Sequence, residues 1–539
     1  MPLSADILFE GGPIHTGLGT LPPGSALAVK HGRVLAVGKA AELRALAVAE
    51  RVDLGGRCLI PGLIDAHNHL SWYAQLLRYV DCRLPSGSSL TVALERLRRR
   101  AEDTPPGEWV GGWGFADYKV SERRFPTLAE MDEAAPAHPA VMIHASGHSA
   151  VANSLALKTM GHTDQTPDPP GGRIERDPRT GRPNGVLHEA AMQGFSLATM
   201  FEEYLSLSVD EQVAILEQGS AEYARLGITT VCDPSVMPPL LTSYQEAERA
   251  GRLRCRVVGM PLHEWSRPIL DSGMLTGFGS DRLKLGPVKL IGDGSLSGRT
   301  AAVTQPYLNA DGLGILYHDQ PQLDAIVREL DHGGQQIAIH AIGDRAVEQV
   351  LRAYEKVVGG GGSNPRRHRM EHAGIVNAEL IRLMAELDVV IATQPRMLFE
   401  QGDGFYRACG EERIPWVYPY RSYVEAGLHV AGSSDCPVVS PDPLLGMRDA
   451  VLRRTEEGRV LAPAQCLTPR QALTMFTQDA AHSLFEEKRL GTLEEGKLAD
   501  LLVLSGDILS LPPEEWEARL KVDMTVVGGE IVYRTDQRP

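Results

Sequence analysis

Residues that can ligate a metal ion stand at the ends of short apolar runs in this sequence. His67 and His69 lie two residues apart in PGLIDAHNHL. Residues two apart on a strand point the same way, so this pair can present both imidazoles to one cation. Later runs end on Lys289, His340, His372 and Asp435. If barrel closure brings these strand ends together, the pattern predicts a metal centre at one mouth of the barrel.

The segments between these positions predict the elements that would bring them together. Eight apolar, β-branched runs alternate with helical patterns, which is typical of βαβ units and a parallel sheet. The runs cover 58–70, 227–235, 253–260, 285–294, 336–344, 368–376, 389–395 and 429–438. A capping box with a first-turn proline, Thr468-Pro469-Arg470-Gln471, marks one helix start. We therefore expect an α/β fold, a (β/α)8 TIM-like barrel over residues 58–484.

The stretch between the first two predicted strands is far longer than a βα unit needs. We expect it to form a large inserted subdomain over 71–225. Its attachment after the first barrel strand would place it over the barrel mouth. The predicted role is a lid or a determinant of substrate specificity.

Both ends of the chain alternate β-like runs with turns. These runs are 5–17, 26–38, 498–507 and 522–534. Isolated hairpins of this size are only marginally stable. We therefore expect residues 1–57 and 485–539 to pair into one small β-sandwich domain.

Composition disfavours several classes of protein and partner. The chain of 539 residues is 43% hydrophobic and carries a net charge of −15, which would repel nucleic acid. We find no apolar run long enough to cross a bilayer, so we expect no membrane partner and, by default, a cytoplasmic location. The seven cysteines are scattered singly, with no CxxC pair. This distribution argues against a disulfide framework and against a zinc-thiolate site.

Taken together, the motifs resemble the amidohydrolase superfamily, and within it the YtcJ-like, or amidohydrolase-3, branch that includes N-substituted formamide deformylases. The resemblance covers nearly the whole chain. PGLIDAHNHL matches the HxH motif of the first strand, and VKLIGDGSLSGRTAAV matches the fourth-strand motif. The later motifs are IHAIGDRAV, RMEHAGIV, GSSDCPV and GTLEEGKLADLLVL.

The resemblance implies a divalent-metal site with one or two ions, zinc being favoured over manganese, iron or cobalt. The implied ligands are His67, His69 and Asp435 for one ion and His340 and His372 for a second. Lys289 would bridge the ions after carboxylation by CO₂, because an ammonium group does not bind metal. A plain lysine that forms an ion pair or contacts substrate beside a single metal is the alternative for Lys289.

The chemistry expected of such a site is hydrolysis by a metal-activated hydroxide, with Asp435 as general base and then acid. Deaminase members typically carry glutamate where this chain has Gly343, so deamination is disfavoured. We expect cleavage of a non-peptide C–N bond, in a linear or N-substituted amide, with a cyclic amide as the nearest variant. Ester, lactone or phosphoester hydrolysis on the same site is the alternative. A non-catalytic scaffold relative is a further alternative from a different class.

The substrate is expected to be a small molecule, and the resemblance implies a possible homodimer. Asp293 could orient a ligand or bind substrate, or it could cap a turn, and Arg299 could contact a substrate oxygen or be a solvated arginine. Core packing is the competing interpretation for the aromatic residues of the insert. The candidates for substrate contact in the insert are Trp113, Phe115, Tyr118, His144, His148 and Glu189.

Overall fold

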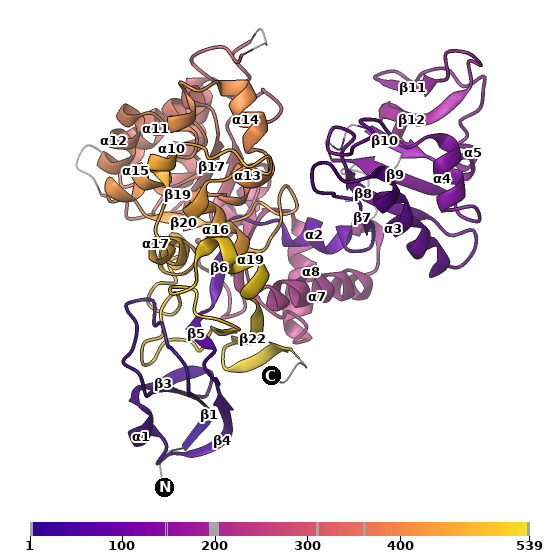
Figure 1. Ribbon diagram of the computed structural model, residues 1–539. Helices are drawn as coiled ribbons and strands as arrows, with labels where there is room; N and C mark the ends of the chain where they lie inside the picture. Colours follow the sequence, from indigo (N-terminus) through magenta and orange to yellow (C-terminus); the bar gives the residue numbers. More distant parts are fainter. Residues whose placement is uncertain are drawn as a thin grey trace. The chain divides into compact units, whose positions relative to one another are not determined.

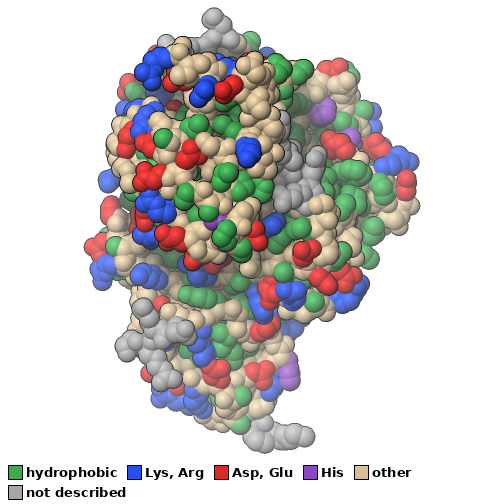
Figure 2. All heavy atoms as spheres, turned by 90° about the vertical axis from the view of Figure 1, so that its right-hand side faces the viewer, with side chains coloured by type: hydrophobic (Ala, Val, Ile, Leu, Met, Phe, Trp, Pro, Cys, Tyr) green, Lys and Arg blue, Asp and Glu red, His purple; other side chains and the backbone are tan. Residues whose placement is uncertain are grey.

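The computed structural model describes residues 4–145, 147, 149–192, 204–308, 312–358 and 363–535 (Figure 1). Contacts between Cα atoms divide the chain into two compact units. The second unit is Ser71–Gly219, and the first comprises Met1–Leu70 together with Ser220–Pro539. Within the described residues, no helix is both long and apolar enough to cross a membrane. Acidic and basic side chains are interspersed on the face drawn in Figure 2, so the net charge of −15 is not gathered in one acidic area there.

Two parallel sheets form the centre of the first unit. One has the strand order β15-β14-β13-β6, and the other runs from β16 to β20 in chain order. The strands are β6 (Leu63–Asp65), β13 (Ile228–Val236), β14 (Arg256–Pro261), β15 (Leu283–Leu285), β16 (Val288–Ile291), β17 (Ile337–Ala341), β18 (Arg369–His372), β19 (Val390–Thr393) and β20 (Val430–Gly432). Each of the eight segments expected to hold a strand contributes one strand to these two sheets, and β15 is an additional short strand.

Two backbone contacts join the two sheets. The Ala66 N–H donates to the Gly432 carbonyl at 3.1 Å, which links β6 to β20. A parallel bridge joins Leu262, the residue that follows β14, to Lys289 of β16. Among the described residues, continuous hydrogen bonding between strands around a closed barrel is therefore found only in part. β6 and β20 are each three residues long. The segments that follow them stay connected, because the Asp435 N–H donates to the His67 carbonyl at 2.8 Å.

Helices alternate with these strands and surround them (Figure 1). In α11 (Asp344–Val358), the buried face includes Val347, Val350 and Tyr354. The predicted capping box at Thr468 is confirmed at the start of α17 (Pro469–Thr474). Among the described residues of the first unit, the other α-helices are α1 (Ala40–Leu43), α8 (Pro238–Arg249), α9 (Ser266–Ser272), α10 (Gln320–His332), α12 (Ala378–Glu386), α13 (Arg396–Glu400), α14 (Gly402–Cys409), α15 (Tyr420–Glu425), α16 (Pro443–Leu452), α18 (Ala480–Ser483) and α19 (Trp516–Arg519), while α7 (Val209–Arg225) spans the boundary between the units.

The ends of the chain contribute two further four-stranded sheets to the first unit. Their strand orders are β3-β2-β1-β4 and β23-β22-β21-β5. The strands are β1 (Ser4–Glu10), β2 (Ser25–Lys30), β3 (Arg33–Lys39), β4 (Ala47–Asp53), β5 (Cys58–Pro61), β21 (Leu501–Leu504), β22 (Val522–Val527) and β23 (Glu530–Arg534). Buried side chains of both sheets, including Phe9, Leu27, Leu501 and Val526, belong to one apolar core. Residues from both ends of the chain therefore share this core.

The second unit is built on a six-stranded sheet of order β11-β12-β10-β9-β8-β7. Its strands are β7 (Val80–Asp81), β8 (Val110–Phe115), β9 (Ala140–His144), β10 (Ser149–Ala152), β11 (Gly172–Arg176) and β12 (Pro183–Glu189). Its described α-helices include α2 (Leu70–Leu76), α3 (Leu90–Glu102), α4 (Leu128–Ala134) and α5 (Ser154–Thr159). Leu97, Met131 and Met142 are among the residues of one of its cores. The unit therefore has an apolar core of its own.

Candidate metal centre

The segments that follow β6 and β20 bring His67, His69 and Asp435 together. His69 Nε2 lies 3.2 Å from Asp435 Oδ1, and His67 Nε2 lies 3.4 Å from the same oxygen. One ligand atom from each of the three residues lies within 4.8 Å of the others, and all three residues are buried. Two imidazole nitrogens and a carboxylate oxygen are a donor set that suits zinc.

A buried carboxylate holds the two segments in register. Asp65 Oδ2 accepts hydrogen bonds from Asn68 Nδ2 at 2.7 Å and from Ser434 Oγ at 2.6 Å, and its Oδ1 accepts one from the Ser434 N–H at 3.0 Å. Burial raises the pKa of Asp65 to about 6, against the effect of these hydrogen bonds. Asp435 itself has a left-handed backbone, with φ of 58°. This conformation is uncommon for residues other than glycine and is of a kind that clusters at functional sites.

Three further predicted residues come from neighbouring strands. The His372 ring lies 5.0 Å from the His67 ring and 4.4 Å from the His340 ring, measured between centroids. Lys289, on β16, is 2% exposed, and its Nζ has no hydrogen-bond partner among the described residues. Burial lowers the pKa of Lys289 to about 8, although the charges of Glu371 and Asp435 oppose this shift. An unpaired buried ammonium is unfavourable. The Lys289 nitrogen is therefore suited to contact a group that is not part of the protein chain, such as a metal ligand or a substrate.

His67 is oriented by an ion pair that the sequence did not reveal. Arg369 Nε and Nη2 each donate to a different oxygen of Glu371 at 2.9 Å, and Glu371 in turn bonds to His67 Nδ1. Arg369 Nη2 also donates to the Ala66 carbonyl at 2.8 Å. With Nδ1 engaged in this way, the imidazole directs Nε2 toward Asp435. The one available signal was the alternation in RMEH, which places Arg369 and Glu371 on one face of β18.

His372 and His340 are held in the neutral form that binds metal. The His372 Nδ1 donates to Gln394 Oε1 at 2.8 Å, and Gln394 Nε2 donates to Ser433 Oγ at 3.0 Å. Burial and the neighbouring His340 keep the pKa of His372 well below its usual value. Burial and the Lys289 charge lower the pKa of His340 to about 3. Both imidazoles are therefore uncharged at neutral pH, as metal ligation requires.

Asp293 anchors the backbone next to His340. Its carboxylate accepts hydrogen bonds from the N–H groups of Ile342 at 2.9 Å and of Gly343 and Ala302 at 2.8 Å each. Burial raises its pKa to about 7 against these bonds. A Cβ at Gly343 would lie 1.9 Å from the Ala302 carbonyl oxygen, so only glycine fits there. This close approach gives a physical reason for glycine at the position where deaminase members typically carry glutamate.

The other residues predicted to contact substrate differ in their local surroundings. Arg299 is exposed and has a left-handed backbone, with φ of 56°. In the second unit, Trp113 is half-buried, with the Arg83 guanidinium 4.6 Å from its ring centroid. Tyr118 is 55% exposed, and its ring centroid lies 6.1 Å from that of His144.

Three other residues were singled out in the insert. Phe115 is buried in a core of the second unit, which agrees with core packing rather than substrate contact. Glu189 is exposed at the end of β12. His148 lies outside the described residues.

Parallel strands whose ends carry a histidine and aspartate donor set are typical of metal-dependent hydrolases on TIM-barrel-like folds. The profile described as "Amidohydrolase family" matches residues 50–533, and the chain therefore belongs to this family. An N-substituted formamide deformylase of Arthrobacter pascens is 33% identical, covering 94% of each chain. YtcJ of Bacillus subtilis (strain 168) is 28% identical over 98% of this chain and 99% of its own.

Among solved structures, an uncharacterized metal-dependent hydrolase from Pyrococcus horikoshii OT3 is similar to this chain. It has a TM-score of 0.73 at 26% identity, covering 94% of this chain and 99% of its own. The predicted resemblance to the family is therefore confirmed, and the fold is α/β and TIM-barrel-like. Family and structure together support a hydrolase that depends on a divalent metal.

Proposed function

We propose that this protein hydrolyses a non-peptide C–N bond, in a linear or N-substituted amide. The observation that carries the proposal is the group of His67, His69 and Asp435, whose ligand atoms lie within 4.8 Å of one another. The similarity to an N-substituted formamide deformylase over 94% of both chains supports the choice of bond. The proposed substrate is a small-molecule amide.

The proposal assigns two sets of ligands to one or two divalent ions, zinc foremost. His67, His69 and Asp435 would hold one ion, His340 and His372 would hold a second, and carboxylated Lys289 would be a ligand shared by the two. The partnerless buried Lys289 Nζ supports this assignment, because a carboxylated lysine would present anionic oxygens instead of an unpaired ammonium. When bound, such ions lower the pKa of a water molecule to about 7 and polarise a carbonyl oxygen.

Asp435 is the proton carrier in this proposal. In the metal-free protein, burial raises the pKa of the Asp435 carboxyl, but the hydrogen bonds to His67 and His69 outweigh that effect and hold the pKa well below its usual value. Asp435 is therefore ionised at neutral pH and can accept the proton of the attacking water. It then donates this proton to the leaving nitrogen, which makes the amine a competent leaving group.

Other residues keep the reacting groups in place. Glu371 and Arg369 fix the ring of His67, and Gln394 fixes that of His372. Asp293 fixes the backbone that follows His340. Positioning of this kind reduces the entropy lost in reaching the transition state.

Matched substrates test the proposal. The purified, zinc-loaded protein is incubated with an N-alkylformamide and with the formate ester of the matching alcohol, and release of formate is measured. We expect metal-dependent cleavage of the amide, and we expect Asp435→Asn to slow it by about 10²- to 10⁴-fold. If the protein cleaved the ester but none of the amides in a broad panel, that result would contradict the assignment to C–N bonds. Bound metal with no hydrolysis at all would favour a non-catalytic relative.

The finer architecture is proposed on the same terms. We infer a closed (β/α)8 barrel within 58–484, a β-sandwich of 1–57 and 485–539, and an insert of 71–225 that acts as a lid. Substrate contacts by Trp113, Tyr118, His144, Asp293 and Arg299, a homodimer and a cytoplasmic location also stay predictions.

A further inference from the structure

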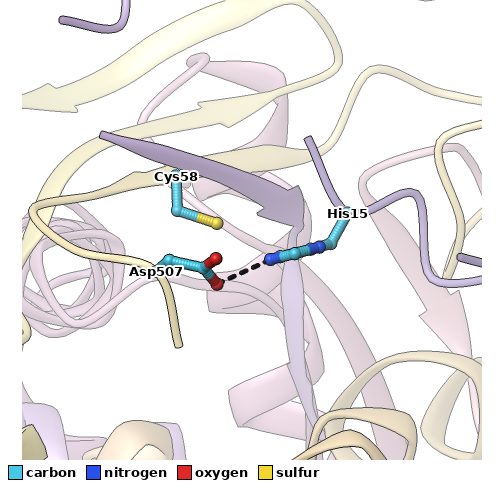
Figure 3. A group of neighbouring side chains, drawn as sticks. All are labelled: His15, Cys58 and Asp507. Carbon is cyan, nitrogen blue, oxygen red and sulfur yellow. Dashed lines mark hydrogen bonds and ion pairs between the residues drawn. The ribbon is translucent and has the colours of Figure 1, made fainter. Parts of the chain in front are cut away.

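A second group of metal-ligating side chains lies in the first unit, on elements that do not contribute to the candidate metal centre. His15, Cys58 and Asp507 each offer one ligand atom, and these atoms lie within 4.8 Å of one another. His15 is 2% exposed, Cys58 is fully buried, and Asp507 is half-buried. Figure 3 shows the Cys58 sulfur and the His15 imidazole facing the Asp507 carboxylate.

Backbone pairing places the three residues. Cys58 opens β5 and pairs with Leu504, the last residue of β21, so that Asp507 follows three residues beyond this pair. The His15 N–H donates to the Leu59 carbonyl at 2.9 Å, which fixes the loop after β1 beside β5. The group therefore lies on paired backbone segments rather than on a loose loop.

Neighbouring polar groups orient two of the three side chains. His15 Nδ1 lies 2.8 Å from Thr20 Oγ1, while Nε2 lies 2.7 Å from Asp507 Oδ1. The other oxygen of Asp507 accepts a hydrogen bond from Ser510 Oγ at 2.7 Å. Such outer contacts fix ring and carboxylate directions, and they are typical of metal ligands.

We propose that His15, Cys58 and Asp507 form a structural site for a divalent cation with affinity for thiolate, zinc foremost. A thiolate, an imidazole and a carboxylate select zinc over magnesium or calcium, and a water molecule can complete four-coordination. Binding releases the Cys58 thiol proton and leaves His15 as the neutral tautomer that carries its proton on Nδ1. The Nδ1–H can then donate a hydrogen bond to Thr20 Oγ1. The cation then takes the place of the proton between His15 and Asp507.

The alternative interpretation is a hydrogen-bonded pair beside an inert thiol. The 2.7 Å separation of His15 and Asp507 is a hydrogen-bond distance, and burial together with the Asp507 charge raises the pKa of Cys58. A cation must therefore displace a firmly held proton, which lowers its affinity. In return it would link residues 492 positions apart, and a crosslink between distant segments stabilises the folded state.

Cobalt binding distinguishes the two interpretations. The full chain is stripped with a chelator and loaded with Co²⁺, and the sulfur-to-cobalt charge-transfer band is recorded in the near ultraviolet. The matched control is Cys255→Ser, because Cys255 is also a buried free cysteine but belongs to neither group of metal-ligating residues. We expect the band in the wild type and in Cys255→Ser, and its loss in Cys58→Ser. We also expect it to persist in Asp435→Asn, which separates this site from the candidate metal centre.

A band that is absent from the wild type, or that survives Cys58→Ser, would overturn the proposal. Should Cys58→Ser fail to fold, Asp507→Asn provides the second test, because it removes the anionic ligand and leaves the thiol. Excess Zn²⁺ is expected to raise the Tm of the stripped wild type by on the order of 2 °C more than that of Asp507→Asn. Equal shifts in the two proteins would contradict a site at these residues. Neither measurement depends on hydrolysis, so the proposed function can fail without affecting this inference.

Discussion

Arg369 and Glu371 stand two residues apart on β18 and form a bidentate ion pair behind His67. Both residues are fully buried, and Arg369 Nε and Nη2 lie 2.9 Å from the two Glu371 oxygens. The Arg369 charge contributes to holding the pKa of Glu371 below its usual value, although burial alone would raise it. Glu371 therefore stays ionised and accepts the Nδ1–H of His67, which leaves Nε2 available to a cation.

Glu371→Gln is expected to weaken metal binding at the candidate centre by about 10- to 100-fold, because His67 loses its anionic anchor. It also leaves the buried Arg369 charge unpaired, so the free energy of unfolding should fall by about 3 kcal/mol. Chelator competition and denaturant unfolding measure the two effects. The control is Glu386→Gln, which removes an exposed partner of Arg382 and should change neither. Unaltered metal affinity in Glu371→Gln would refute the positioning role.

Lys289 should make the stability of the metal-free protein depend on pH. Burial lowers the pKa of Lys289 from 10.5 to about 8, so between these values the unfolded chain binds more protons than the folded protein. Stability attributable to this group therefore rises as pH increases from about 8 to about 10.5, by about 3 kcal/mol in all. Lys289→Met should remove this rise, as denaturant unfolding of stripped protein at several pH values would reveal. Parallel pH profiles for the two proteins would contradict the prediction.

Asp435→Asn should lower kcat for amide hydrolysis by about 10²- to 10⁴-fold, since the amide side chain cannot carry the proton. Asp388→Asn is the matched control, because Asp388 is exposed and has a left-handed backbone that asparagine also tolerates. Steady-state kinetics on zinc-loaded proteins of confirmed folding measure the effect. If the Asp435 variant kept wild-type kcat, another group would have to be the proton carrier.

Gly343→Ala should destabilise the protein by about 2 kcal/mol or more, because the new Cβ would collide with the Ala302 carbonyl and disturb the hydrogen bonds of Asp293. Gly404→Ala, on α14, is the control, since a Cβ added there would have no neighbouring atom of the described residues within 4 Å. That substitution should be neutral or stabilise the helix by up to about 1 kcal/mol. Thermal unfolding compares the two variants, and equal Tm values would show that the backbone around Asp293 can relax.

The sequence predicted the residues whose positions depend on local pattern. The helix start at Thr468 follows from its capping box, whereas His67 and His69 come together with Asp435 although both lie beyond the end of β6 and not on the strand. The link from Asp65 to Ser434 was missed, because it joins residues 369 positions apart through side chains. The cysteine pattern was interpreted as evidence against zinc-thiolate ligation, yet the structure brings Cys58 beside His15 and Asp507. Spacing rules recognise only ligands that are neighbours in the chain.

Zinc content per chain tests the central claim most directly. Wild-type protein and a His67→Ala/His69→Ala variant are stripped, reloaded with Zn²⁺, desalted and measured by elemental analysis, with folding checked by circular dichroism. The comparison removes any contribution from the His15, Cys58 and Asp507 group, which both proteins retain. We predict that the wild type holds at least about one more zinc ion per chain than the variant and that only the wild type hydrolyses amides. Equal zinc contents in the two folded proteins would contradict a metal centre at these strand ends.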